Sequence, residues 1–301
     1  MFEPGYIKLY ESGKLQEIAK KLYDIYDNCT LCPRMCNVNR KKGGKGVCSA
    51  GTGVKISSVS PHFGEERPLV GRKGSGTIFL AHCSLLCLYC QNWDISQSGE
   101  GNEVSDKEFA SAMLQLQKMG CHNINFVTPT HYLPNIVRAL VYAVENGLHV
   151  PLVYNTGGYE RVETLRLLDG VIDIYMPDYK YSQGKTAAKY SRGAKDYPEV
   201  VKAALKEMHR QVGVLQTDEN NIALKGLIIR HLVLPGGLAG TEAFVKFVAG
   251  ELDPGTYVNM MAQYRPCYQA HNYPELSRGL YAAEFQKALI TAREHGLFNL
   301  D

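Results

Sequence analysis

Apolar residues recur along the chain in short runs that alternate with stretches of helical period. Six runs of four to eight residues are almost wholly apolar, as is typical of strands buried on both faces. They are residues 77–81, 123–127, 151–154, 171–176, 227–234 and 256–261. Helical patterns follow each run, over residues 106–119, 134–145, 161–168, 198–211, 240–249 and 282–295. This alternation predicts an α/β fold around a parallel sheet.

The number of units favours an open barrel. A closed barrel of eight units needs about 250 residues, whereas residues 77–301 number 225. The connection over residues 178–197 is long and polar, and residues 212–224 predict an inserted hairpin. We therefore expect a partial (β/α)6 TIM-like barrel over residues 77–301.

The first 76 residues have a different pattern. Apolar positions at helical spacing predict one amphipathic helix over residues 6–26. Four cysteines follow within 20 residues, with proline and glycines between them, and predict a compact four-cysteine knuckle (residues 29–48). Residues 51–76 are rich in Gly, Ser and Pro and predict a linker. We expect two domains, 1–76 with the helix, knuckle and linker, and 77–301 with the barrel.

Composition and charge restrict the function classes. The net charge of +3 and the pI near 8.3 are too mild to predict a nucleic acid or an anionic membrane as partner. No apolar run approaches the roughly 18 residues that span a bilayer, and the N-terminus lacks the pattern of a secretory signal. Nine cysteines without an export signal indicate reduced thiols. We expect a cytoplasmic protein that uses cysteines as metal ligands.

Three cysteines lie close together directly after the first strand. Cys83, Cys87 and Cys90 have the spacing C-x3-C-x2-C. Three thiolates on one loop can ligate three irons of a [4Fe–4S] cluster and leave the fourth iron for an exogenous ligand. The alternative is structural: positions i, i+4 and i+7 share one helical face, on which cysteines pack as small apolar residues.

The knuckle predicts a second metal site. Its candidate ligands are Cys29, Cys32, Cys36 and Cys48. Zinc sites usually have two C-x2-C pairs, and only Cys29 and Cys32 form one here, so an iron–sulfur cluster fits about as well. The pattern leaves iron–sulfur and zinc both open.

The cysteine triplet resembles that of the radical S-adenosylmethionine (radical SAM) superfamily. In that superfamily this spacing, with an aromatic residue before the third cysteine (here Tyr89), binds a [4Fe–4S] cluster whose open iron chelates S-adenosylmethionine. The resemblance implies a barrel of the radical SAM type and reductive cleavage of the cofactor to a 5′-deoxyadenosyl radical. That radical abstracts hydrogen from a substrate, so no catalytic side chain is expected beyond the cluster and the cofactor.

Polar residues at the strand ends match such a cofactor. In parallel barrels these ends collect ligand-binding groups. Lys180 or Arg230 would hold the carboxylate of the cofactor. Asn155 and Thr156 would bind its ribose or its amino acid part. Asp178 would bind a cation or the amino group of the cofactor. Tyr89 would pack behind the adenine, and Gln263 follows the last strand. Each has a structural alternative, such as a surface ion pair between Asp178 and Lys180.

A longer set of stretches is similar to the pyruvate formate-lyase activating-enzyme-like family. They are residues 29–40, 61–66, 74–79, 90–93, 126–131, 230–236 and 262–266. By this resemblance Asn155, Thr156, Met176, Asp178 and Lys180 surround the cofactor. After the second strand, the Gly-Gly-Glu common in the family is replaced by Thr128-Pro129-Thr130.

The resemblance implies a radical SAM oxidoreductase, with a glycyl-radical-enzyme activase as one version. An unidentified small molecule or peptide is an equally open substrate, and an external one-electron donor of the flavodoxin or ferredoxin type is implied. The alternative from another class is a non-catalytic iron–sulfur electron carrier, which would not bind S-adenosylmethionine. The role of Cys267 and the oligomeric state stay open.

Overall fold

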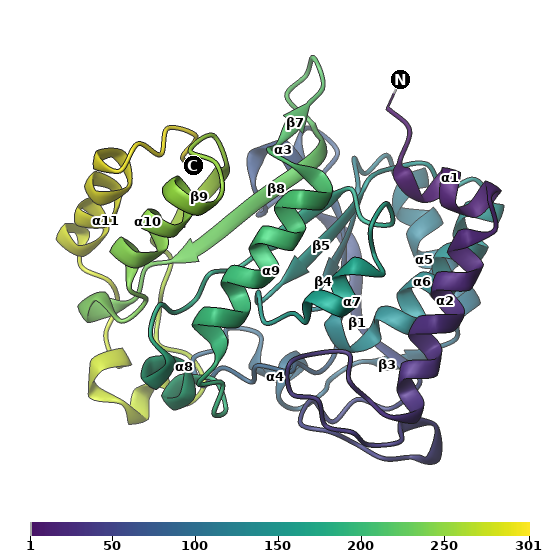
Figure 1. Ribbon diagram of the computed structural model, residues 1–301, viewed down its shortest axis with the longest axis horizontal. Coiled ribbons are helices and arrows are strands. Elements are labelled where there is room, and N and C mark those ends of the chain that lie inside the picture. Colours follow the sequence, from purple (N-terminus) through teal and green to yellow (C-terminus); the bar gives the residue numbers. More distant parts are fainter. Residues whose placement is uncertain (1) are drawn as a thin grey trace.

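The protein is built around one curved, mainly parallel sheet, shown in Figure 1. The structure is a computed structural model that describes residues 2–301. Its strands are β1 Val54–His62, β2 Ser75–Leu80, β3 Asn102–Val104, β4 Ile124–Val127, β5 Leu152–Thr156, β6 Ile174–Pro177, β7 Gln216–Thr217, β8 Ala223–Leu232 and β9 Tyr257–Met261. Strands β2, β4, β5, β6, β8 and β9 pair in parallel and in that order. These are the six strands expected from the apolar runs.

Helices connect the parallel strands and cover the outer face of the sheet. In residues 2–301 the α-helices, of which the first three precede the parallel strands and the last follows them, are α1 Gly5–Glu11, α2 Lys14–Asp24, α3 Arg67–Val70, α4 Trp93–Ser96, α5 Asp106–Lys118, α6 Leu133–Glu145, α7 Val162–Arg166, α8 Gly184–Tyr190, α9 Tyr197–Val212, α10 Thr241–Glu251 and α11 Ala282–Glu294. A parallel pair requires such a crossover, because the chain must return to the end of the sheet at which the previous strand began. The α/β architecture with a mainly parallel sheet is therefore confirmed.

Two local expectations are wrong, and a third segment has more structure than its pattern indicated. The helix expected over residues 6–26 is two helices, α1 and α2, because Gly13 between them has a left-handed backbone with φ of 76°. The connection over residues 178–197, expected to be long and polar, also contains α8. The segment 51–76, expected as a linker, contains β1, which pairs antiparallel with β2, and α3. The division of the chain into two domains after residue 76 stays a prediction.

The expected hairpin is present. Strand β7 pairs antiparallel with the beginning of β8 through a turn at residues 218–221. In Figure 1 this hairpin projects at the top, whereas α4, α8 and the purple-to-blue loops that follow α2 lie at the opposite end of the sheet. The carboxyl ends of the parallel strands therefore face the side that carries both groups of cysteines.

The inner face of the sheet has its own apolar cluster. Along β6, Tyr175 packs into the large core with the helices, whereas Ile174 and Met176 pack into a second, smaller cluster. Leu69 of α3 belongs to that second cluster, together with residues from β5, β8 and β9. Because successive side chains of a strand point to opposite faces, the second cluster fills the interior of the partial barrel. The interior is thus closed beneath the strand ends.

Across residues 2–301 no helix combines the length and the apolar character that crossing a membrane requires.

Candidate functional site

A single cavity lies at the carboxyl ends of the parallel strands. Its volume is about 270 Å³. Ten of the residues predicted for the cluster and the cofactor line it: Cys83, Cys87, Tyr89, Cys90, Asn155, Thr156, Asp178, Lys180, Arg230 and Gln263. They come from the loop after β2 and from the ends of β5, β6, β8 and β9. The fold therefore brings together residues that lie up to 180 positions apart in the sequence.

The three cysteines lie on an irregular loop, which we call the cysteine loop (residues 82–92). The helical alternative for this triplet is therefore wrong. Two residues of the loop, His82 and Leu86, have positive φ values of 74° and 51°. Such left-handed residues turn the chain sharply, and here they let the loop wrap around the mouth of the cavity.

Each cysteine sulfur of the loop has a polar neighbour. The backbone N–H of Leu85 donates to Cys83 Sγ over 3.4 Å. Ser96 Oγ donates to Cys90 Sγ over 3.2 Å, and Ser191 Oγ lies 3.0 Å from Cys87 Sγ. Hydrogen bonds to sulfur stabilise the added electron of an iron–sulfur cluster. The surroundings of the three thiols thus suit cluster ligands.

Burial keeps two of these thiols, Cys83 and Cys90, protonated when no metal is bound. It raises the pKa of Cys83 to about 12 and also raises the pKa of Cys90. Within residues 2–301, no group of three or more His, Cys, Asp or Glu side chains converges on a point where a single ion could sit. In a [4Fe–4S] cluster each thiolate binds a different iron, so its ligands surround a volume instead of a point.

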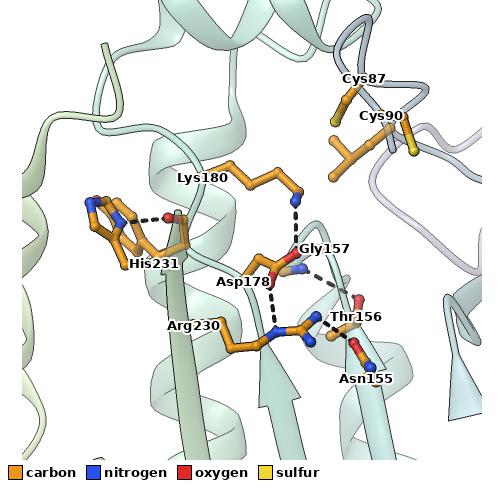
Figure 2. Close-up of polar contacts among 12 residues, drawn as sticks. Cys87, Cys90, Asn155, Thr156, Gly157, Asp178, Lys180, Arg230 and His231 are labelled. Carbon is orange, nitrogen blue, oxygen red and sulfur yellow. Dashed lines mark hydrogen bonds and ion pairs between the residues drawn. The ribbon is translucent and has the colours of Figure 1, made fainter. Parts of the chain in front are cut away.

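Asp178 is the centre of a charged network opposite the cysteines. Its carboxylate accepts hydrogen bonds from Lys180 Nζ over 2.7 Å and from Arg230 Nε over 2.9 Å. Arg230 Nη2 also donates to Asn155 Oδ1 over 2.6 Å. Figure 2 shows these contacts and the side chain of Lys180 extending toward Cys87 and Cys90. The side chains of Asp178 and Lys180 are only 14% and 17% exposed and line the cavity, so the alternative of a surface ion pair is wrong.

The charges of this network hold one another ionised. Burial alone would raise the pKa of Asp178, but Arg230 and Lys180 outweigh it and keep that pKa below its usual range. Burial would lower the pKa of Lys180, and Asp178 with Cys87 reverses this effect and raises it. Behind them, Glu65 Oε2 lies 3.5 Å from Arg230 Nη1, and burial raises the pKa of Glu65. Two cations are therefore fixed and charged at the wall of the cavity.

Thr156 is positioned by a buried carboxyl group that the sequence did not reveal. Glu160 accepts hydrogen bonds from the hydroxyls of Thr156, Thr130 and Tyr154. Glu160 is 1% exposed, and burial raises its pKa to about 7. Thr130 belongs to the segment that replaces the Gly-Gly-Glu of the resembling family. Glu160 therefore forms hydrogen bonds both to the end of β5 and to the segment that replaces Gly-Gly-Glu.

Two glycines after β5 allow close packing at the cavity. A Cβ on Gly157 would lie 2.6 Å from Leu85 Cδ1 of the cysteine loop. Gly158 has φ of 78°, and a Cβ there would lie 2.3 Å from the carbonyl oxygen of Asp178. The glycines therefore allow β5 to approach both the cysteine loop and the charged network.

The remaining predicted residues differ in placement. Tyr89 is buried and packs edge to face with Tyr181 and Tyr264. Gln263 is exposed, at the outer side of the cavity. Met176 does not line the cavity, because its side chain packs in the inner apolar cluster beneath Asp178. Met176 is therefore not among the predicted residues that the fold brings to the cavity, and its place around the cofactor stays a prediction.

The four cysteines of the knuckle line a second, closed pocket. Cys29, Cys32, Cys36 and Cys48 share it with Arg34, Arg40 and His131, among others. The structure thus gathers the four predicted ligands in one pocket, and both iron–sulfur and zinc stay predictions for it. Neither Cys121 nor Cys267 lines this pocket or the cavity at the strand ends.

Sequence reasoning missed several residues that contact the site. Ser191 lies in the long connection after β6, and its link to Cys87 spans 104 positions. Glu65 lies in one of the stretches that carry the family resemblance, and nothing else in the sequence indicated that it lies near the site. Ser96 and Glu160 have no local pattern that marks them.

The chain is similar to several known proteins. The family model described as the radical SAM superfamily matches residues 77–218. The chain is 35% identical over 296 residues to the uncharacterized protein MJ0674 of Methanocaldococcus jannaschii, covering 93% of this chain and 78% of that protein. It is 28% identical over 167 residues to MJ0808 of the same organism, covering 50% of this chain and 48% of that protein. A solved structure of TYW1 with a lysine-pyruvate adduct bound has a TM-score of 0.46 and 12% identity, over 72% of this chain and 73% of that chain.

Proposed function

The chain belongs to the radical SAM superfamily, and we propose that its Cys83, Cys87 and Cys90 ligate a [4Fe–4S] cluster. The enzymes of this superfamily use such a cluster together with S-adenosylmethionine. When bound, the cluster and the cofactor supply reductive cleavage of the sulfonium to methionine and a 5′-deoxyadenosyl radical. The donor set fits, because three soft sulfur ligands and a charged polar wall line one cavity.

The charged wall would orient the cofactor. Lys180 uses one of its three N–H donors on Asp178, which leaves the others for the carboxylate of the cofactor. Asn155 and Thr156 would bind its ribose or amino acid part. Arg230 and Asp178 act as positioning residues, because each holds Lys180 or Asn155 in place. Fixed partners of this kind reduce the reorganisation that binding requires.

The cavity would also exclude water from the radical. Tyr89 forms a buried aromatic cluster with Tyr181 and Tyr264 at one wall, and Leu85, Leu232 and Met261 supply further apolar lining. An apolar lining around a reactive intermediate suppresses side reactions. The observation that carries the proposal is this one cavity, lined jointly by the three cysteines and the charged network.

Reductive cleavage of the cofactor tests the proposal. The protein is reconstituted anaerobically with iron and sulfide, then given dithionite and S-adenosylmethionine. We expect 5′-deoxyadenosine from the wild type and from Cys121→Ala, a matched control outside both cysteine pockets, but none from Cys87→Ala. A protein that holds the cluster and exchanges electrons without forming 5′-deoxyadenosine would instead be an electron carrier.

For the substrate we propose hydrogen abstraction from a glycine of a partner protein. The support is the similarity of seven sequence stretches to the pyruvate formate-lyase activating-enzyme-like family. The electron would come in the cytoplasm from a flavodoxin- or ferredoxin-type donor. Electron paramagnetic resonance of a co-encoded partner, after incubation with the reduced enzyme and cofactor, should show a glycyl radical. Its absence, with 5′-deoxyadenosine still formed, would favour a small molecule or peptide as substrate.

A further inference from the structure

The knuckle has a backbone shaped around its four sulfurs. Met35 and Asn37, on either side of Cys36, have positive φ values of 39° and 54°. Such conformations cost energy in residues other than glycine and persist only where the surroundings require them. A Cβ on Gly46 would lie 2.7 Å from Cys36 Sγ, so only glycine lets the chain pass this close to that sulfur. The strain and the close approach both bring the four thiols to one pocket.

Two arginines at this pocket lack a negative partner. Arg40 is 2% exposed, and its guanidinium donates only to the carbonyls of Gly51 and His131 and packs over the ring of Tyr26. Arg34 likewise donates only to carbonyls. Neither forms an ion pair with any carboxylate of residues 2–301. A buried charge without a counter-charge is costly, and a metal held by four thiolates supplies a net negative charge at this place.

The histidine at this pocket has an unused nitrogen. His131 Nε2 lies 2.7 Å from the carbonyl oxygen of Ala81, so this nitrogen carries the proton and donates. Its Nδ1 is then a bare acceptor, buried and without a hydrogen-bond partner in the structure. A nitrogen in this state can accept a hydrogen bond or bind a metal, and His131 lines the pocket of the four thiols.

The knuckle also contacts the cysteine loop directly. Arg34 Nε donates to the carbonyl oxygen of Ser84, between Cys83 and Cys87, over 3.0 Å. Arg34 Nη2 donates over 3.0 Å to the carbonyl oxygen of Ser191, whose hydroxyl lies 3.0 Å from Cys87 Sγ. One arginine of the knuckle thus touches the loop and a neighbour of one of its ligands.

We propose that Cys29, Cys32, Cys36 and Cys48 hold a second iron–sulfur cluster, coupled to the cluster of the cysteine loop through Arg34. A purely structural zinc ion would account for the four thiols and for the arginine charges. The contacts from Arg34 join this pocket to the cysteine loop and would form beside either metal. The four cysteines contain only one C-x2-C pair, whereas zinc sites usually have two, and this spacing favours iron and sulfide over zinc. The coupling rests on the proposed function, whereas the second cluster stands without it.

The metal content of a variant without the first site tests the second cluster. The full-length chain carrying Cys83→Ala, Cys87→Ala and Cys90→Ala is purified anaerobically, and its iron, acid-labile sulfide and zinc are measured. We expect about four irons and about four sulfides per chain, against about eight of each in the reconstituted wild type. Stoichiometric zinc in place of iron, or no metal in a variant with a wild-type circular dichroism spectrum, would overturn the proposal.

A complementary variant separates this test from a folding defect. Cys32→Ser with Cys48→Ser should lose about half of the iron and keep the signal of the cysteine-loop cluster. Cys267→Ser, outside both pockets, should lose none. If the triple variant holds iron while the wild type forms no 5′-deoxyadenosine, the proposed function fails and the second cluster stands.

Electron paramagnetic resonance tests the coupling without using activity. Dithionite adds one electron to each cluster, and two paramagnetic centres that lie close together broaden each other's lines. The reduced wild type should therefore give a spectrum that differs from the sum of the triple variant and the Cys32→Ser/Cys48→Ser variant. Arg34→Gln should shift the midpoint potential of the cysteine-loop cluster, because a positive charge beside it is removed. A wild-type spectrum equal to the sum, with an unchanged potential in Arg34→Gln, would overturn the coupling.

Discussion

The buried carboxyl group of Glu160 makes the stability of this protein depend on pH. It supports Thr156 at the cavity, and burial raises its pKa to about 7 from an ordinary value of 4.5. Between these two values the folded state holds a proton that the unfolded chain has released. Raising the pH through this window therefore lowers the stability, and the loss is complete above the folded pKa.

The substitution Glu160→Gln removes this titration and keeps the shape of the side chain. Each pH unit of the window is worth about 1.4 kcal/mol, so between about pH 5.5 and about pH 8.5 the wild type should lose about 2 kcal/mol more than the variant. The free energy of unfolding is measured by urea denaturation of the metal-free chain, followed by circular dichroism.

A second buried acid provides the control. Burial also raises the pKa of Asp173 to about 7, and this group titrates equally in the wild type and in Glu160→Gln. Its contribution therefore cancels in the difference between the two proteins, and Asp173→Asn should show a comparable but separate loss of pH dependence. Parallel stability curves for the wild type and Glu160→Gln would refute the reasoning, because they would place the folded pKa of Glu160 at its ordinary value.

Three further predictions concern the cavity. Lys180→Met should weaken the binding of S-adenosylmethionine, measured by calorimetry, about 10- to 100-fold, as expected for the loss of one charge-assisted hydrogen bond. Lys180→Arg should keep most of the affinity. Equal affinities of the wild type and Lys180→Met would exclude a contact between Lys180 and the carboxylate. Gly158→Ala should destabilise the protein in thermal unfolding by about 3 kcal/mol, because a left-handed backbone and a collision with a carbonyl oxygen add together. The control is Gly193→Ala, because Gly193 also has a left-handed backbone, with φ of 73°, but open space around it. This variant should lose about 1 kcal/mol of stability. Equal losses in Gly158→Ala and Gly193→Ala would mean that the structure relaxes to remove the collision. Ser96→Ala should lower the midpoint potential of the cluster by about 20 to 60 mV, the equivalent of one lost hydrogen bond to Cys90 Sγ, and an unchanged potential would contradict that bond.

The sequence determined the periodic elements and the local motifs of this protein. Six buried strands with intervening helices follow from apolar runs, because a parallel sheet covered on both faces requires them. The cysteine loop and the residues at the strand ends followed from the rule that parallel strands collect ligand-binding groups at their carboxyl ends. Those residues do share one cavity. Met176 does not line that cavity, because its side chain faces the interior cluster.

Only the tertiary structure decided which distant groups meet. The hydroxyl of Ser191 reaches the sulfur of Cys87, and the guanidinium of Arg34 reaches the carbonyl of Ser84, contacts that span 104 and 50 positions. Strand β1 is a strand because β2 pairs with it, although its own residues have the composition of a linker. The periodicity of apolar residues and the spacing of motifs reflect interactions between residues that are close in the sequence. The supporting contacts of this site depend on how loops fold back over the sheet, and no local pattern carries that information.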